Sequence, residues 1–371
     1  MNMNKRAAQF VAVVLTTQFI FSAPGFSQTT DSLYVADDGD NTVKRFGLQG
    51  ESLGTFVKST NGLHGPMGLV FKANGDLIVS DQNTGTSANS DILEYDATGQ
   101  LLKKLVVHND PDSPVASRGL ILWRDSRAKQ DFIFVADFTT EPNSSKPPTP
   151  GRLLKYTAEG KLVDTFVPSN LSFGTCAVPP PGNPVSGQFH PRGLVLGPDG
   201  LIYISSYTCT GSGLRGQVIR FDPLNGRGAF KDVFIDSSND LNRPEGLVFG
   251  PDGYLYITSF RADKTDSDKI LVFQGPSNGS PGSLVNTINL YTAGDDAHRV
   301  YAQALLFGPG GKLFVPISGG GPSTTEIGSV RRYDLSNNNH FDVFVPAGTV
   351  KAGWYLTFGR TNPSTLAYGS R

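Results

Sequence analysis

The chain contains 371 residues, which is enough for one large all-β domain or for two domains of ordinary size. Its 32 Lys and Arg residues nearly balance its 33 Asp and Glu residues, so a formal net charge of -1 offers no strong field for nucleic acid or an anionic membrane. The 43 glycines and 25 prolines favour many short strands joined by turns over helices.

The first 28 residues are typical of a secretory signal peptide. Lys5 and Arg6 precede an apolar stretch that ends in small residues, so we expect cleavage between Ala23 and Gln28. A retained membrane anchor is the alternative, but Gln and Thr residues interrupt the stretch before it reaches the roughly 20 apolar residues of a span. The mature chain, residues 29–371, is therefore predicted to be secreted or periplasmic, without a membrane span.

The chain has two cysteines, Cys176 and Cys209. In an oxidising compartment a single disulfide is the expected state, with two free thiols as the alternative. Closing a loop of about 33 residues would contribute roughly 3 to 4 kcal/mol in the chain-entropy model. Neither cysteine has a helix N-terminus or a basic neighbour that would lower its pKa, which argues against a catalytic thiol.

One pattern recurs five times along the chain: an apolar strand, a tight turn with glycine, and a second strand of alternating polarity. The copies begin at Gly65, Ala116, His190, Arg243 and Tyr301. A third and a fourth strand follow in every copy, for example "DILEYD" and "LLKKLV" in the first. Four antiparallel strands repeated radially predict a β-propeller, because a closed ring protects the strand edges.

The two ends of the mature chain supply a sixth unit. "SLYVADDGDNTVKRFGLQGESLGTFV" provides second, third and fourth strands, while "GWYLTFGRTNPSTLAYGS" provides a first strand and a candidate second strand. "LYVAD" and "TLAYG" therefore compete for one position. We predict a single all-β domain over residues 29–371 with six four-stranded antiparallel blades, closed by pairing of the two ends; a seventh blade would be badly incomplete.

"SLYVADDGDNTVKRF" and "GPMGLVFKANGDLIVSDQ" resemble NHL repeats, and the resemblance extends over nearly the whole mature chain. The pattern is also similar to that of the gluconolactonase and senescence-marker family, the streptogramin lyases and the peptidyl-amidoglycolate lyases. The resemblance implies a propeller whose first strands line a central channel. It does not select a function, because these families include metal-assisted enzymes while many NHL propellers only bind other molecules.

In this architecture the residue before each first-strand glycine, or before the position equivalent to it, should point towards the channel mouth. These residues are Met67, Arg118, Arg192, Glu245, Gln303 and Trp354. Arginines, a carboxylate and an amide around a concave opening suit a carboxylate or a sugar acid. The alternative is that Arg192 and Glu245, which lie on adjacent blades, pair with each other and close the mouth.

A second ring of short polar residues marks the ends of the second strands. It comprises Asp37, Asp81, Asp137, Ser206, Ser259 and Ser370, with Ile317 breaking the series. Such side chains usually accept hydrogen bonds from the following turn, which is the favoured interpretation. A metal site built from these carboxylates is the alternative, although the asparagines of the gluconolactonase pattern cannot be placed.

His64, His190 and His298 lie in loops that enter alternate blades, and three protein ligands with an open position suit catalytic zinc. The amidoglycolate lyase pattern, however, places histidine where this chain has Met67 or Arg192, so surface or turn histidines are favoured. The acidic segments 37–41 and 263–268 offer oxygen atoms to calcium without the twelve-residue loop pattern. No cofactor is predicted; a bound divalent metal such as calcium or zinc is the alternative.

No nucleophile motif occurs in the strand, turn and helix context that such chemistry requires. The sequence predicts an exported, monomeric propeller that binds a small polar ligand, or an extracytoplasmic protein or cell-surface partner, at its channel mouth. The alternative is a metal-dependent, lactonase-like hydrolase or lyase acting at the same mouth. A third possibility is a scaffold whose channel is closed by the pairing of Arg192 and Glu245.

Overall fold

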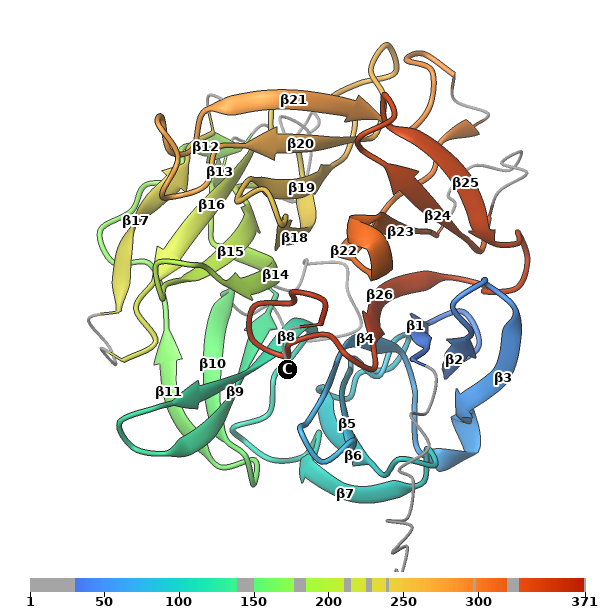
Figure 1. Cartoon of the computed structure of the whole chain (residues 1–371). Helices are drawn as coiled ribbons and strands as arrows, with labels where there is room; N and C mark the ends of the chain where they lie inside the picture. The colour runs from blue at the N-terminus through green and yellow to red at the C-terminus, as the bar shows by residue number, and fades with distance from the viewer. Residues whose placement is uncertain are drawn as a thin grey trace, which may run out of the picture. The chain divides into compact units, whose positions relative to one another are not determined.

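The computed structural model describes residues 31–138, 150–176, 185–209, 215–224, 229–237, 240–295, 298–318 and 327–369. Six four-stranded antiparallel sheets form a ring of blades around a central channel, which confirms the predicted all-β six-bladed propeller (Figure 1). None of the helices in these residues is long and apolar enough to cross a membrane. The predicted signal peptide lies outside the described residues.

In blades 2 to 6 the strands follow chain order from the channel outwards. Blade 2 contains β4 (Pro66–Phe71), β5 (Leu77–Asp81), β6 (Asp91–Tyr95) and β7 (Leu101–Val106). Blade 3 contains β8 (Ser117–Asp125), β9 (Gln130–Asp137), β10 (Arg152–Thr157) and β11 (Leu162–Phe166). Blade 4 contains β14 (His190–Leu196), β15 (Ile202–Tyr207), β16 (Gly216–Phe221) and β17 (Phe230–Ile235).

Blade 5 contains β18 (Pro244–Phe249), β19 (Leu255–Ser259), β20 (Lys269–Phe273) and β21 (Leu284–Asn289). Blade 6 contains β22 (Leu306–Phe307), β23 (Leu313–Ile317), β24 (Ser329–Asp334) and β25 (His340–Val345). A two-stranded ribbon of β12 (Thr175–Cys176) and β13 (Val185–Ser186) precedes blade 4. Two short 3-10 turns complete the described elements, η1 (Ser59–Asn61) and η4 (Pro309–Gly311).

Blade 1 joins the two ends of the described chain. Its order from the channel outwards is β26 (Gly353–Phe358), β1 (Leu33–Asp37), β2 (Thr42–Phe46) and β3 (Ser52–Val57). Leu33 pairs antiparallel with Phe358 on one side and with Phe46 on the other. "LYVAD" therefore occupies the second-strand position, and "TLAYG" is left without a strand to join.

The first strands of neighbouring blades approach each other most closely at their glycines. An added Cβ on Gly193 would lie 2.6 Å from the carbonyl oxygen of Glu245, and one on Gly68 would lie 2.8 Å from that of Arg118. Gly119 and Gly246 are similarly confined, and blade 6 has Ala304 at this position. Blades 2 to 6 thus have a small residue at the contact next to the channel, whereas blade 1 has Tyr355 at the equivalent position.

Leucines fill the channel below this ring of small residues. Each first strand carries a buried leucine directly after the small residue or its equivalent: Leu69, Leu120, Leu194, Leu247, Leu305 and Leu356. Together with Leu366 they surround a residual cavity of only about 20 Å³. The channel is therefore a packed core with room for no more than about one water molecule.

The C-terminal tail, residues 359–369, brings Leu366 to this core by crossing the centre of the ring (Figure 1). The amides of Leu122 in blade 3 and Leu196 in blade 4 donate hydrogen bonds of 3.0 Å to the tail carbonyls of Pro363 and Ser364. Leu366 contacts four of the apolar clusters although its own φ is 55°. A non-glycine residue pays about 1–2 kcal/mol for that left-handed conformation, which contacts with the core must offset.

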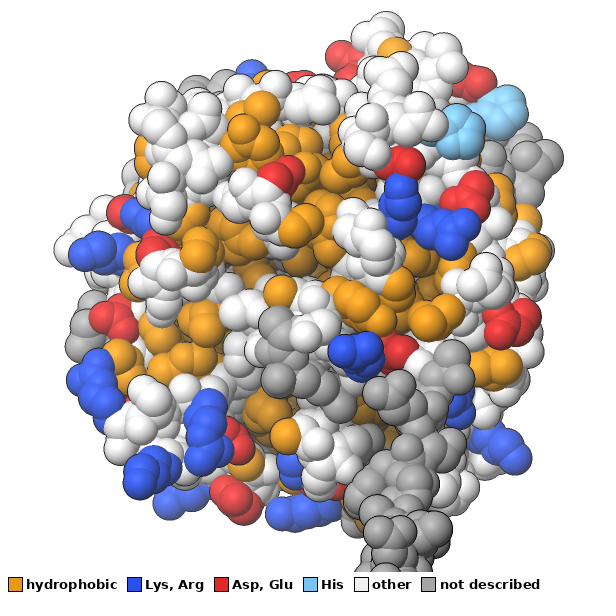
Figure 2. Space-filling view, viewed as in Figure 1, with side chains coloured by type: hydrophobic (Ala, Val, Ile, Leu, Met, Phe, Trp, Pro, Cys, Tyr) orange, Lys and Arg blue, Asp and Glu red, His pale blue; other side chains and the backbone are white. Residues whose placement is uncertain are grey.

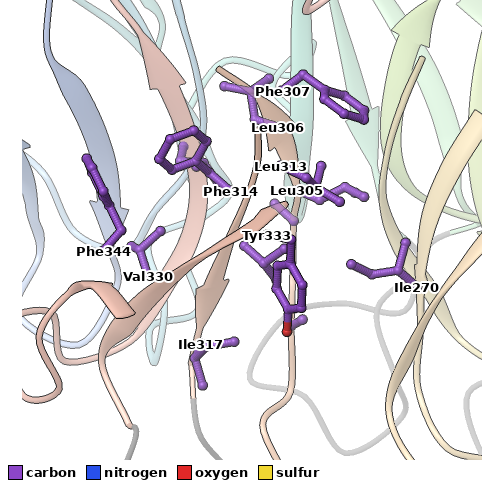
Figure 3. Close-up of a cluster of buried hydrophobic side chains, with 14 of the residues drawn as sticks. Ile270, Leu305, Leu306, Phe307, Leu313, Phe314, Ile317, Val330, Tyr333 and Phe344 are labelled. Atoms are coloured by element: carbon purple, nitrogen blue, oxygen red, sulfur yellow. The ribbon is translucent and has the colours of Figure 1, made fainter. Parts of the chain in front are cut away.

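Aromatic and aliphatic side chains pack each blade against the next. In blade 6, Phe314 lies edge-on to Phe344 and to Phe358 of blade 1, with ring centroids 5.0 Å apart in both pairs. Figure 3 shows Phe314 and Phe344 beside Val330, with Ile270 of blade 5 on the other side of the cluster. Both faces of the blade are therefore buried, as the repeated apolar letters predict.

We define two faces of the ring. The mouth face is the one at which the first strands begin, and it carries the loops that enter them. The turn face is the one at which the first strands end, and it carries the turns to the second strands and the C-terminal tail. The residues before the glycines belong to the mouth face.

We expect Gly193→Ala to destabilise the protein by at least about 2 kcal/mol, because the new Cβ would overlap backbone atoms of blade 5 that cannot move independently. Denaturant unfolding at equilibrium measures this loss. Gly279→Ala is the matched control, since an added Cβ there meets nothing within 4 Å. Equal midpoints for the two variants would contradict the close approach.

Leu366→Ala should cost about 2 kcal/mol of unfolding free energy, because it removes the side chain with which the tail closes the channel core. Thermal and urea unfolding give the value. Leu102→Ala, at a leucine that is 55% exposed, should change stability by less than about 0.5 kcal/mol. A loss no larger than that of the control would show that the tail lies on the ring without stabilising it.

Candidate functional site

A local irregularity of the first strands directs the predicted residues into the mouth. The pairing of first and second strands shifts register around Met67, Arg118, Arg192 and Glu245, in blades 2 to 5. At three of these bulges the following glycine amide donates to a second-strand hydroxyl instead of to the sheet ladder, at 2.9 to 3.0 Å. A bulge re-aims a side chain, so these residues leave the sheet plane.

The same hydroxyls join neighbouring blades. Ser80 Oγ donates to the carbonyl oxygen of Arg118 at 2.7 Å, and Ser205 Oγ donates to the carbonyl oxygen of Glu245. Each serine thus accepts from a glycine of its own blade and donates to the mouth residue of the next blade. The backbone of the mouth is fixed by these bridges.

Arg192 is held between two aromatic rings. Its guanidinium carbon lies 3.8 Å from the centroid of Phe138 and 4.3 Å from that of Tyr207. Such contacts are worth about 2 kcal/mol or more when the cation is desolvated, as this buried arginine is. The rings orient the guanidinium plane and leave its edge for hydrogen bonding.

Arg192 and Glu245 approach each other without a direct hydrogen bond. Nε of Arg192 lies 3.6 Å from Oε1 of Glu245, and that oxygen accepts the hydroxyl of Tyr207. In the described part of the chain, Nε and Nη1 of Arg192 and Oε2 of Glu245 have no hydrogen-bond partner. The predicted pairing is therefore electrostatic only, and buried donors and an acceptor stay available.

Arg118 interacts with the charges of Arg192 and Glu245. Its guanidinium carbon lies 4.6 Å from the Trp354 ring centroid, and its Nη1 lies 3.8 Å from the sulfur of Met67. Burial, helped by the positive charge of Arg192, lowers the pKa of Arg118 to about 10, so the group stays charged at neutral pH. Its Nε has no hydrogen-bond partner among the described residues.

Gln303 and Tyr355 contribute further unsatisfied groups, as does Oδ1 of Asp38. Within the described residues, neither Oε1 of Gln303 nor the hydroxyl of Tyr355 has a hydrogen-bond partner. Burial raises the pKa of Tyr355 and of Tyr207, so both phenols remain protonated. The unsatisfied groups thus include arginine donors, a carboxylate and an amide acceptor, and a hydroxyl.

Three residues near the mouth were not singled out from the sequence as mouth residues: Asp38, Phe138 and Tyr207. Asp38 is hydrogen-bonded to Thr84 and Trp354 and interacts with the charge of Arg118, and burial raises its pKa. All three directly follow the polar residue at the end of a second strand. Because strand side chains alternate in direction, shifting the second-ring alignment by one residue would have found them.

The second ring itself has a structural role. Both carboxylate oxygens of Asp81 accept the amide of His64, Asp137 accepts that of Ala116, and the hydroxyl of Ser206 accepts that of His190. These donors belong to the loop entering the same blade, whereas the sequence favoured donors from the following turn. Asp37 has both kinds, the amides of Ala352 and Gly39. Ser370 lies outside the described residues.

The histidines do not combine into a ligand set. His64 and His298 are exposed, whereas His190 is buried with Nδ1 2.8 Å from the carbonyl oxygen of Gln188. Among the described residues there is no group of three or more His, Cys, Asp or Glu side chains that could hold a metal ion. The three predicted histidines are therefore not brought together as a set of ligands in the described residues.

Lysines neutralise carboxylates of both acidic segments. Nζ of Lys44 lies 3.0 Å from Asp37 and 2.9 Å from Asp40, and Nζ of Lys269 lies 2.8 Å from Asp266. The paired carboxylates already have a cation. This arrangement favours the interpretation of these segments as solvated turns.

The predicted disulfide joins Cys176 to Cys209 across a Cα separation of 5.6 Å. Cys209 follows Tyr207 by two residues, so the bridge ties the loop entering blade 4 to the segment that holds Glu245. The disulfide confirms the sequence-based pairing and anchors one wall of the mouth.

No family model matches the chain, and no curated protein sequence matches it. Among solved structures it is similar to the periplasmic gluconolactonase of Pseudomonas aeruginosa, with a TM-score of 0.52 and 17% identity over 88% of this chain and 98% of that one. It is also similar to a Thermus thermophilus protein named as a putative oxidoreductase (glucose dehydrogenase), with a TM-score of 0.52 and 15% identity over 81% and 92%.

At these identities the likeness shows the fold alone. The six-bladed propeller with gluconolactonase-like structural neighbours is thereby supported. The NHL assignment has no family match and stays a prediction.

Burial, together with the charge of Arg192, lowers the pKa of His190 to about 4. In the unfolded chain this histidine binds its proton near pH 6.5. Between pH 6.5 and 4 the unfolded state therefore binds more protons, and stability falls as the pH falls, by up to roughly 3 kcal/mol. We expect urea unfolding of the wild type to show this loss and His190→Asn to lack it.

The comparison with the variant is needed because Asp81 acts in the opposite sense. Burial raises the pKa of Asp81 to about 7, so its contribution to stability falls as the pH rises, and both proteins carry it. A His190 ring that titrates near pH 6.5 by NMR would contradict the prediction.

Proposed function

We propose that this protein is an extracytoplasmic binding protein whose channel mouth takes a small carboxylate with hydroxyl groups, of the sugar-acid type. One observation carries the proposal: buried Arg192 and Glu245 stand side by side while both keep unsatisfied hydrogen-bonding atoms. Leaving such a group unsatisfied costs about 1–3 kcal/mol, and more when it is charged. A ligand that satisfies these atoms recovers that free energy.

The available atoms define the ligand. The guanidinium groups of Arg192 and Arg118 donate, which suits a carboxylate. Oε2 of Glu245 and Oε1 of Gln303 accept, which suits ligand hydroxyls. An aliphatic carboxylate would satisfy only the first pair, so hydroxyls should contribute to specificity.

The location rests on three supporting points: the predicted signal peptide of residues 1–28, the disulfide and the periplasmic gluconolactonase among the structural neighbours. We also propose that the mature protein, residues 29–371, is a single domain and a monomer. A protein or cell-surface partner at the same face is a further possibility that the ligand test addresses. Nucleic acid is not an expected partner at a net charge of -1.

Isothermal titration of the mature protein with D-gluconate tests the proposal, with hexanoate as the ligand without hydroxyls. We expect gluconate to bind more tightly. Arg192→Gln should weaken binding about tenfold to a hundredfold, the equivalent of about 1.5–3 kcal/mol for a hydrogen bond to a charged group. Gln303→Leu should reduce the preference for gluconate over hexanoate.

Arg124→Gln is the matched control, because this arginine is 61% exposed and belongs to the turn face. It should bind like the wild type. If gluconate, glucuronate, galacturonate and citrate all fail to bind, or if Arg192→Gln binds as the wild type does, the proposal is wrong and a scaffold with a closed mouth replaces it.

The second candidate is a lactonase-like enzyme at the same mouth, favoured by the gluconolactonase among the structural neighbours. The described residues contain no group of three or more His, Cys, Asp or Glu side chains that could hold a metal ion. Hydrolysis of glucono-δ-lactone, measured with calcium, with zinc and with chelator, separates the two functions. Turnover that Glu245→Gln abolishes would favour the enzyme over the binding protein.

A further inference from the structure

The turn face carries a hollow that the leucine core separates from the mouth. Its volume is about 450 Å³. The walls are the ends of β14, β18 and β22 with their turns, and the C-terminal tail; the larger side chains among them are Leu196, Pro198, Phe249, Pro251, Phe307 and Tyr368. Figure 2, which views this face, shows hydrophobic side chains exposed in a hollow near its centre.

The hollow exists because the tail is asymmetric. The tail bonds to the first-strand ends of blades 3 and 4, at Leu122 and Leu196. The corresponding ends of blades 5 and 6, at Phe249 and Phe307, line the hollow. The turn that follows β22 in blade 6 contributes Gly310 and Gly311, where an added Cβ would meet nothing within 4 Å. The side away from the tail therefore stays open.

The aromatic walls are fixed in place. The Phe249 ring meets Tyr203 edge-on at 5.0 Å, Phe307 meets Tyr256 at 5.0 Å, and Tyr368 meets Phe358 at 5.3 Å. The tyrosine hydroxyls behind the first two rings donate to the turn carboxylates of Asp199 and Asp252 at 2.8 and 2.7 Å. A hollow with such walls is preformed, so a ligand does not have to order them on binding.

The chemistry of the lining selects a neutral ligand. None of the described residues that line the hollow carries a charge. Turn amides are already used within the turns, as in the bonds from Gly250 to Tyr254 and from Gly308 to Lys312, both 2.9 Å. The hydroxyl of Tyr368 is hydrogen-bonded to Asp31. A charged ligand would lose its hydration here without gaining a partner.

We propose that this hollow is a binding site for a neutral, predominantly aromatic small molecule of bicyclic or tricyclic size. Ligand sites are typically concave, mostly apolar and about 300–1,000 Å³ in volume, and an apolar cavity of about 150 Å³ holds a single benzene. Rings placed against Phe249, Phe307 and Tyr368 would gain edge-to-face contacts. This inference does not depend on the function proposed for the mouth.

The neutral fluorophore N-phenyl-1-naphthylamine is a suitable probe, because its emission rises when it leaves water. We expect saturable binding to the mature protein with one site per chain. Ala367→Trp places a large ring at a lining position and should abolish the fluorescence increase or weaken binding at least tenfold. Ala97→Trp, at an exposed residue of a blade 2 turn outside the hollow, is the matched control and should bind like the wild type.

A second variant, Thr365→Trp, fills the hollow from another lining position and protects the test against misfolding of the first. Circular dichroism verifies that each variant is folded. Gluconate should not compete with the probe, which separates this site from the mouth. The proposal is overturned if the wild type shows no saturable binding, or if both folded filling variants bind as it does.

Sedimentation velocity distinguishes a further occupant. If a second copy of the chain covers this face, the wild type will dimerise with rising concentration, the probe will not bind, and Ala367→Trp will be monomeric. That outcome also overturns the proposal. A monomeric wild type that binds the probe supports it.

Discussion

The contact between backbones of neighbouring first strands is the constraint on which this propeller depends. A Cβ added to Gly193 would lie within 2.6 Å of blade 5, and the equivalent positions of blades 2, 3 and 5 have comparable clearances. Only a small residue fits at these four positions, whereas blade 1 carries Tyr355 at the equivalent one. The residue before it must leave the contact towards the mouth, and the residue after it must turn into the channel. One steric requirement thus generates a polar rim and a leucine core at successive positions.

This arrangement explains why charged groups can remain unsatisfied at the mouth. Arg192 and Glu245 are held by aromatic rings and by backbone bridges from Ser205 and its relatives, not by bonds to each other. The leucines below exclude water from the channel side, so the local dielectric is low and each hydrogen bond made there counts for more. Folding has already removed water from these groups, so ligand binding does not have to offset their desolvation, and the site is preorganised.

The repeat letters were sufficient for the blades and their number, because strand periodicity and glycine turns are local signals. They also selected residues that lie next to one another, Met67 with Arg118 and Arg192 with Glu245, and they paired Cys176 with Cys209. They could not decide between "LYVAD" and "TLAYG", since that choice depends on a pairing between the two ends of the chain. The pairing geometry of Arg192 and the aromatic walls depend on side-chain packing between blades, which no local pattern encodes.

Ring closure has a consequence for the order of folding. The second strand of blade 1 is near the start of the described chain and its first strand is near the end. Leu33 can therefore pair with Phe358 only after almost the whole propeller between them has been synthesised. Such non-local pairing must overcome the entropy of closing a very long loop, which slows folding. Until β26 pairs with it, β1 has an unpaired edge, and the channel core lacks Leu356 and Leu366. A chain built in this way stays incomplete during synthesis and finishes as a ring only once its last strand and tail are free to dock.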